Sequence, residues 1–190
     1  MSSFLTPSRL AMSVAPEAQE TSLPVDLFKK AFRNHPAGVA LVVGDPGEHP
    51  VALTVSSLSS ISTEPPLMMF SVSAQSSSSQ VLQDVETVVV HMLGAAQLDL
   101  AQLGAMSGVD RFADTNAWVR LPSGEPVFLG VDAWIRGRVV HRLEAGNSTV
   151  YVIHALDAAI SEQAEGASTV EPLVYHNRVW HQLDARSAIS

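Results

Sequence analysis

The pattern of apolar positions predicts one amphipathic helix near the start of the chain, between Pro24 and Pro36. Asp26 lies in its first turn, where the helix dipole favours an acidic side chain. The residue before a proline is pushed out of the α region, so the helix should end at His35. The apolar residues that recur at the spacing of one helix face are Val25, Leu27, Phe28, Ala31 and Phe32.

After Pro36 the apolar residues occur in short runs and in alternation, which is typical of β-strands. The turn Asp45–Glu48, with its proline and glycine, predicts a hairpin between the first two strands. Helical spacing returns at 76–82 and 97–106. Strands are predicted over 39–43, 51–56, 67–72, 87–93, 133–142, 148–159 and 173–183, with a shorter apolar stretch at 127–129. We therefore expect a mainly β protein, a β-barrel with a few peripheral α-helices and not an alternating βαβ sheet.

The same pattern indicates a single domain with short flanking segments. Residues 1–22 are rich in small and polar residues and predict a flexible leader. The domain is expected over 23–184, followed by a C-terminal tail over 185–190. A chain of 190 residues is long enough for one hydrophobic core.

Composition excludes several classes of function. The net charge of −8 argues against binding to nucleic acid, which relies on clustered Lys and Arg. The chain has no cysteine, so disulfides, iron–sulfur clusters and thiolate metal sites are excluded. No apolar run resembles a signal peptide or a membrane span, so we expect a soluble, cytoplasmic protein with no membrane contact. With 46% hydrophobic and only 16% charged residues, apolar surface remains for an interface between copies of the chain.

Common catalytic motifs are missing from the sequence. There is no GxGxxG, GxxxxGK[ST] or HExxH pattern, so dinucleotide-fold, P-loop and zincin functions have no support. The seven histidines show no ligand-like spacing with neighbouring carboxylates. We therefore predict no metal site.

The most informative stretch is a run of hydroxyl residues between two apolar strands, from Thr54 to Ser62, closed by Pro65 and Pro66. Small hydroxyl side chains allow a flat ring to approach the backbone, whose N–H and C=O groups can pair with the edge of the ring. The alternative is a serine-rich strand end with solvated hydroxyls, which composition alone favours.

A second hydroxyl cluster, from Ser71 to Ser79, leads into the predicted helix. A serine-rich turn before a helix offers free backbone N–H groups and hydroxyl donors to a phosphate. Helix capping by serine explains the same residues equally simply. Together the two clusters suggest the two ends of a phosphorylated ring cofactor.

The order of several motifs resembles the flavin reductase-like, FMN-binding split β-barrel family. The block Thr54–Leu67 carries the most specific part of the resemblance, which extends over about residues 26–183. The other matching segments are Phe32-Arg33, Pro36–Val39, the serine turn, Asp110–Phe112, Pro126 to Gly130, Ala145–Ser148 and Pro172 to Tyr175.

The resemblance implies an antiparallel Greek-key split barrel, a homodimer, and FMN or FAD bound without a covalent bond. It implies that NADH or NADPH reduces the flavin, which then serves a flavin-dependent monooxygenase or stays bound. Asn147 and Ser148 fall in the turn that approaches the nicotinamide and are the catalytic candidates. The isoalloxazine would lie against Ala52, Leu53, Thr54, Ser56 and Ser57, and the ribityl-phosphate arm against Ser71, Val72, Ser73, Ser76, Ser77 and Ser78.

Three departures from the family pattern bear on activity. Gly-Asp-His is frequent in the nicotinamide turn, where this chain has Gly146-Asn147-Ser148, and Ala52 stands where glycine is frequent. Leu103-Gly104 replaces an Arg-Phe pair and removes a cationic partner for phosphate.

Asp110 and Arg111 are interpreted as an ordinary surface pair of small energetic value. The alternative to a reductase is therefore an accessory flavin-binding protein with little nicotinamide turnover.

Overall fold

The computed structural model describes residues 22–47, 49–161 and 170–189. Contacts divide the chain into two units, residues 1–32 and 33–190. The predicted helix is confirmed as α1 (Val25–Arg33), on which the rings of Phe28 and Phe32 lie 4.6 Å apart between centroids. The expected leader over 1–22 falls outside the described residues except for Ser22.

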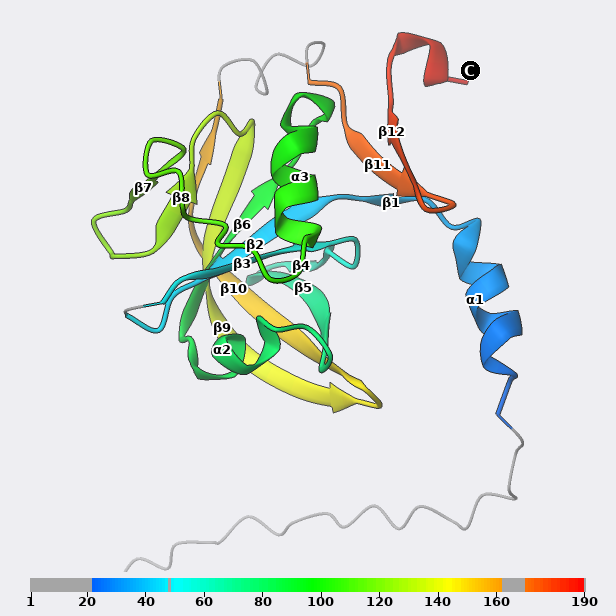
Figure 1. Ribbon diagram of the computed structural model, residues 1–190, viewed down its shortest axis with the longest axis horizontal. Coiled ribbons are helices and arrows are strands. Elements are labelled where there is room, and N and C mark those ends of the chain that lie inside the picture. The colour runs from blue at the N-terminus through cyan, green and yellow to red at the C-terminus, as the bar shows by residue number, and fades with distance from the viewer. Residues whose placement is uncertain (1–21, 48, 162–169, 190) are drawn as a thin grey trace, which may run out of the picture. The chain divides into compact units, whose positions relative to one another are not determined.

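The second unit is built on a seven-stranded antiparallel sheet (Figure 1), which confirms a mainly β fold. The strand order is β3-β2-β6-β9-β10-β5-β4. The strands are β2 (Ala40–Gly44), β3 (Val51–Val55), β4 (Ser59–Thr63), β5 (Pro66–Ser73), β6 (Thr87–Met92), β9 (Ala133–Ala145) and β10 (Ser148–Ile160).

Smaller sheets and short helices surround this sheet. The helices are α2 (Ser79–Asp84), η1 (Ala95–Gln97), α3 (Leu98–Ala105) and η2 (Ala185–Ser187). None of the helices in the described ranges is long and apolar enough to cross a bilayer. One small sheet has the order β1-β11-β12, with β1 (Ala37–Gly38), β11 (Leu173–His176) and β12 (Val179–Gln182); the other pairs β7 (Trp118–Arg120) with β8 (Pro126–Phe128).

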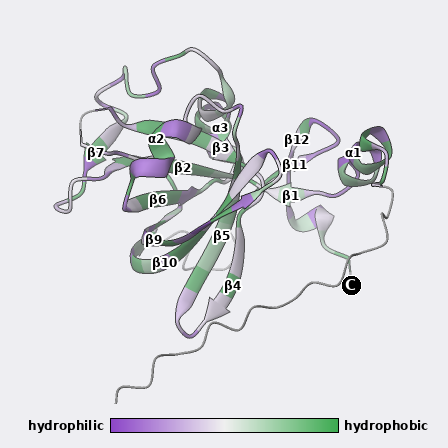
Figure 2. Cartoon of the chain, turned by 90° about the horizontal axis from the view of Figure 1, so that it is seen from below, coloured by the Kyte–Doolittle hydropathy of each residue, from purple (hydrophilic) through white to green (hydrophobic). Residues whose placement is uncertain are grey.

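Both faces of the central strands are buried, which explains their continuous apolar runs. On β2, Ala40 and Val42 belong to one core cluster, and Leu41 and Val43 belong to another. The first cluster lies among β2, β3, β5, β6 and β10. The second lies under α3, β8 and β11. Figure 2 shows the hydrophobic stretches along β5, β9 and β10.

The structure corrects three details of the predicted secondary structure. The single strand expected over 173–183 is two strands, because Asn177 and Arg178 turn the chain with φ values of 51° and 65°. The segment Ser59–Thr63 of the hydroxyl block pairs with β5 as strand β4. Trp118–Arg120 forms strand β7, which was not predicted.

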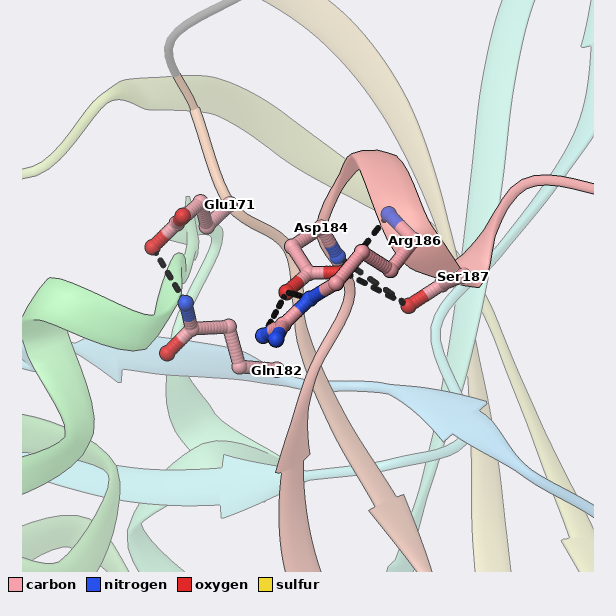
Figure 3. Close-up of polar contacts among 5 residues, drawn as sticks. All are labelled: Glu171, Gln182, Asp184, Arg186 and Ser187. Atoms are coloured by element: carbon pink, nitrogen blue, oxygen red, sulfur yellow. Dashed lines mark hydrogen bonds and ion pairs between the residues drawn. The ribbon is translucent and has the colours of Figure 1, made fainter.

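The chain after β12 is ordered by polar contacts (Figure 3). The carboxylate of Asp184 accepts hydrogen bonds from the backbone N–H and the guanidinium of Arg186, and Gln182 donates to Glu171. Part of the expected tail over 185–190 is therefore the turn η2, with Asp184 as its N-cap.

His91 is fully buried on β6 and connects β2 to β8. Its Nδ1 lies 3.2 Å from the carbonyl oxygen of Leu41, and the backbone N–H of Phe128 donates to its Nε2 over 3.0 Å. Because Nε2 accepts, this network assigns a neutral ring with its proton on Nδ1. Burial lowers the pKa of His91 from 6.5 to about 4, although the hydrogen bond to Leu41 acts in the opposite direction.

Candidate functional site

A cleft of about 760 Å³ opens between β3, the end of β5 and the segment that follows α3. In Figure 1, α3 lies beside β2 and β3, with which it is in contact. The cleft is lined by Leu53–Ser57 from β3 and the chain after it, Ser71–Ser73 and Gln75–Ser77 from β5 and its turn, Ser148 from β10, and Gly104, Ala105, Ser107, Gly108 and Arg111 from α3 and beyond.

The end of β3 is held against β5 by a side chain. Ser57 Oγ accepts a hydrogen bond from the backbone N–H of Ser71 over 2.9 Å and donates to its carbonyl oxygen over 3.2 Å. Strand β4 pairs with β5 only between Pro66 and Met69. Ser57 comes just before β4 in the chain, and its side chain extends the contact along the same edge of β5 to Ser71. Its hydroxyl therefore fixes the two walls of the cleft relative to each other.

The helix α3 packs on β3 with no room for a side chain at the contact. Thr54 Oγ1 donates to the carbonyl oxygen of Ala101 over 2.7 Å. A Cβ at Gly104 would collide with Leu41 Cδ1 and Thr54 Oγ1 and would lie 3.1 Å from the Thr54 nitrogen. Close packing therefore favours glycine at position 104. This explains why the chain lacks the second, aromatic residue of the Arg-Phe pair there; it does not explain Leu103.

The serine turn is folded by its own polar groups. The backbone N–H of Ser76 donates to the carbonyl oxygen of Ser73, and Ser79 Oγ donates to the carbonyl oxygen of Ala74. The Ala74 N–H donates to the carbonyl oxygen of Asn147, which attaches the turn to the β9–β10 hairpin. Ser73 and Ser77 are exposed at the cleft, whereas Ser78 is buried.

The structure brings together most of the residues predicted for the site. Leu53, Thr54, Ser56, Ser57, Ser71, Val72, Ser73, Ser76, Ser77 and Ser148 all line the same cleft. Three predicted residues are not among its lining residues. Ala52 lies in the core, Ser78 is buried at the start of α2, and Asn147 is exposed at the tip of the hairpin.

Arg111 is the residue that the sequence interpretation missed. The predicted surface pair with Asp110 is not formed among the described residues. Asp110 Oδ1 accepts the backbone N–H of Phe112, and Arg111 donates to the carbonyl oxygen of Met106. The Nε atom of Arg111 is buried without a hydrogen-bond partner among the described residues, and desolvation lowers the pKa of this guanidinium. The segment Asp110–Phe112 matches the family pattern in the sequence. That match alone did not show that Arg111 lines the cleft.

Comparison with known proteins identifies what the chain resembles. Residues 32–184 match the flavin reductase like domain. The NADH:FMN oxidoreductase of Rhodococcus qingshengii is 36% identical over 182 residues, which cover 96% of this chain and 93% of that protein. The reductase component of the 4-nitrophenol 4-monooxygenase/4-nitrocatechol 2-monooxygenase of Rhodococcus opacus is 26% identical, with 92% and 97% covered.

A solved structure supports the same assignment. The crystal structure of a flavin reductase domain protein from Arthrobacter sp. FB24 superposes with a TM-score of 0.76 at 30% identity, covering 83% of this chain and 94% of that chain. The family match covers most of the domain, including both serine segments and Arg111. The chain therefore belongs to the flavin reductase-like family.

Proposed function

We propose that this protein is an NAD(P)H-dependent flavin reductase that holds FMN or FAD without a covalent bond in the cleft described above. The observation that carries the proposal is the meeting of two serine segments, one after β3 and one at the end of β5, in one cleft of a flavin reductase-like chain. The similarity to an NADH:FMN oxidoreductase over nearly the whole chain favours turnover, rather than an accessory flavin-binding role.

The residues present fit a phosphorylated ring cofactor. Cofactor sites usually have volumes of about 300–1,000 Å³, and the cleft, at about 760 Å³, is within that range. Its lining combines hydroxyl and backbone donors with one cation, Arg111, and the described lining residues include no carboxylate. An anionic phosphate would therefore find donors and no repulsion.

Each part of the cleft has a separate task in this proposal. We propose that backbone groups of Leu53 to Ser56, which line the cleft, hold the edge of the flat ring, and that Ser73 and Ser77 donate to the ribityl-phosphate arm. Ser57 keeps these two walls at a fixed spacing. When bound, the flavin supplies the acceptor for a hydride from the reduced nicotinamide.

The β9–β10 turn is proposed to adjoin the nicotinamide. Ser148 lines the cleft, whereas Asn147 contributes its carbonyl oxygen to Ala74 and keeps its side chain exposed. Of the two catalytic candidates, Ser148 is therefore the one placed to contact a bound molecule. Its short neutral hydroxyl would align the nicotinamide less firmly than an imidazole.

We also propose that the mainly β fold is a Greek-key split β-barrel. The hydrogen-bonded sheet is open, with β3 and β4 at its two edges. The bond of Ser57 to Ser71 joins the end of β3 to β5, next to the β4 edge, and so brings the two sides of the sheet together. We take 23–184 as the folded domain.

We further propose that the protein is a cytoplasmic homodimer that supplies reduced flavin to a monooxygenase. Leu143, Leu156 and Ile160 on the β9–β10 hairpin are 62%, 45% and 56% exposed, which suits an interface with a second copy. The relative that is a reductase component of a two-component monooxygenase supports the oxygenase partner. Light scattering should give twice the 20.2 kDa chain mass, and a monomer mass would contradict the dimer.

The flavin site is tested by titrating the purified protein with FMN and with FAD while following flavin fluorescence. We expect saturable binding at one flavin per chain. NADH and NADPH oxidation is then measured with the better flavin. Absence of saturable binding by either flavin would overturn the proposed function.

A further inference from the structure

We propose that helix α1 of one copy of the chain packs on the outer face of β5, β9 and β10 of a second copy, so that two copies exchange their helices. This inference rests on the proposed homodimer and names the elements that hold it together. Two apolar surfaces that remain uncovered in the described part of one chain lead to it.

The first uncovered surface is one side of α1. At about 100° per residue, the apolar side chains fall on one half of the helix and the charged side chains on the other. No residue of α1 is buried, and Val25 and Phe28 are 65% and 52% exposed. A helix of nine residues is too short to be stable in water by itself, so packing of its apolar side must stabilise it. That side consists of Val25, Leu27, Phe28, Ala31 and Phe32.

The second uncovered surface is the outer face of the sheet where β5, β10 and β9 are neighbours. Phe70 of β5 belongs to the first core cluster, so Met69 beside it points to the opposite face. Met69 lies opposite Val152 of β10, and Val150 lies opposite Leu143 of β9. We define the outer face by Met69, Val150, Val152 and Leu143. All four are at least partly exposed, and neither core cluster includes them.

The two surfaces match in length and in charge. With nine residues, α1 is about 13 Å long, and the five residues of β10 from Val150 to His154 also extend over about 13 Å. The helix carries three basic residues and one acid, whereas exposed Glu64 and Glu144 lie at the turns that end the outer face. The basic helix is therefore attracted to this face of a second copy.

A second copy covers both surfaces at once. In a twofold dimer each α1 lies on the outer face of the partner, so four apolar surfaces are buried in two equal contacts. The net charge of −8 works against an anionic lipid surface as the partner of the helix, although the helix itself is basic.

The exchange is tested directly by disulfide formation, because the chain has no cysteine of its own. A variant with both Phe28→Cys and Met69→Cys is oxidised and analysed on a non-reducing gel. We expect a linked dimer of twice the 20.2 kDa chain mass. The control combines Phe28→Cys with Val119→Cys, an exposed residue of β7 outside the outer face, and should stay unlinked. An intramolecular disulfide, no disulfide, or equal linking of the control would overturn the inference.

A second measurement asks whether α1 holds the dimer together. Val25→Glu combined with Phe28→Glu should raise the dissociation constant of the dimer at least ~100-fold, as measured by light scattering over a dilution series. The domain should stay folded by circular dichroism, because α1 has no buried residue. Lys30→Glu changes the net charge by the same amount on the polar side of the helix and should leave the protein a dimer.

The remaining outcomes contradict the inference in distinguishable ways. If the wild type sediments with phosphatidylglycerol vesicles, and the glutamate variant loses this binding but stays a dimer, the helix serves a lipid surface instead. A dimeric wild type whose mass the glutamates do not change refutes the helix exchange alone, whereas a monomeric wild type refutes the proposed dimer as well. FMN titration of the wild type tests the flavin site independently of all these results.

Discussion

Acidification should destabilise the protein well above the pH at which carboxylates titrate, because His91 is held neutral in the core. Its folded-state pKa of about 4 lies below the ordinary value of 6.5. Between these values the unfolded chain binds a proton that the folded chain excludes, so stability is present above pH 6.5 and is lost as the pH falls.

The magnitude follows from the two pKa values. Each pH unit of difference corresponds to about 1.4 kcal/mol, so the complete loss on reaching pH 4 is about 3 kcal/mol. Between about pH 7.5 and about pH 5 the loss is about 2 kcal/mol. Glu125, whose carboxylate accepts from Thr87 and Arg136, also has a lowered pKa, and its contribution is lost only at more acidic pH.

Urea unfolding of the flavin-free protein, followed by circular dichroism at the two pH values, measures this loss. His91→Gln removes the titrating group while its amide can still donate to Leu41 and accept from Phe128. The variant should be less stable near neutral pH and should lose most of the pH dependence. His141→Gln, an exposed histidine on β9, is the matched control and should keep the wild-type slope. Equal slopes for wild type and His91→Gln would refute the reasoning.

Other substitutions test the walls of the cleft. Gly104→Ala should cost about 1–3 kcal/mol by overpacking α3 against β3 and should weaken FMN binding, as measured by urea unfolding and flavin titration. Ser57→Ala should cost about 1–3 kcal/mol, because it leaves the N–H and C=O of Ser71 without their partner, and should raise the dissociation constant for FMN. Asn147→Asp combined with Ser148→His should raise kcat/KM for NADH with nearly unchanged FMN affinity; loss of FMN binding would show that this turn has another role.

Much of the fold was predictable because the periodicity of each strand is a local property. The predicted strands at 51–56, 67–72 and 148–159 correspond to β3, β5 and β10. The double strand at the C-terminus was not predicted, since its turn uses Asn177 and Arg178 at positive φ without the glycine that normally marks such a hairpin.

The serine segments of the site were predictable, but its third wall was not. Ser56 and Ser73 belong to hydroxyl clusters that stand out in the sequence. Gly104 and Arg111 line the cleft because α3 packs closely on β3 and because the segment after α3 runs back along the cleft. Both are features of the tertiary structure, which the local sequence pattern does not show. Ala52 was assigned to the site, but it lies on the face of β3 that packs into the core under α3.

The most direct test of the central claim is the reduction of FMN by NADH under anaerobic conditions, measured with a matched pair of variants. Ser56→Tyr places a large side chain at a residue that lines the cleft, and Ser59→Tyr places the same side chain at an exposed residue of β4 outside it. We predict that wild type and Ser59→Tyr reduce FMN in proportion to the NADH consumed, whereas Ser56→Tyr loses both FMN binding and turnover. Undiminished FMN reduction by Ser56→Tyr, or the absence of NADH-dependent reduction in the wild type, would contradict the account.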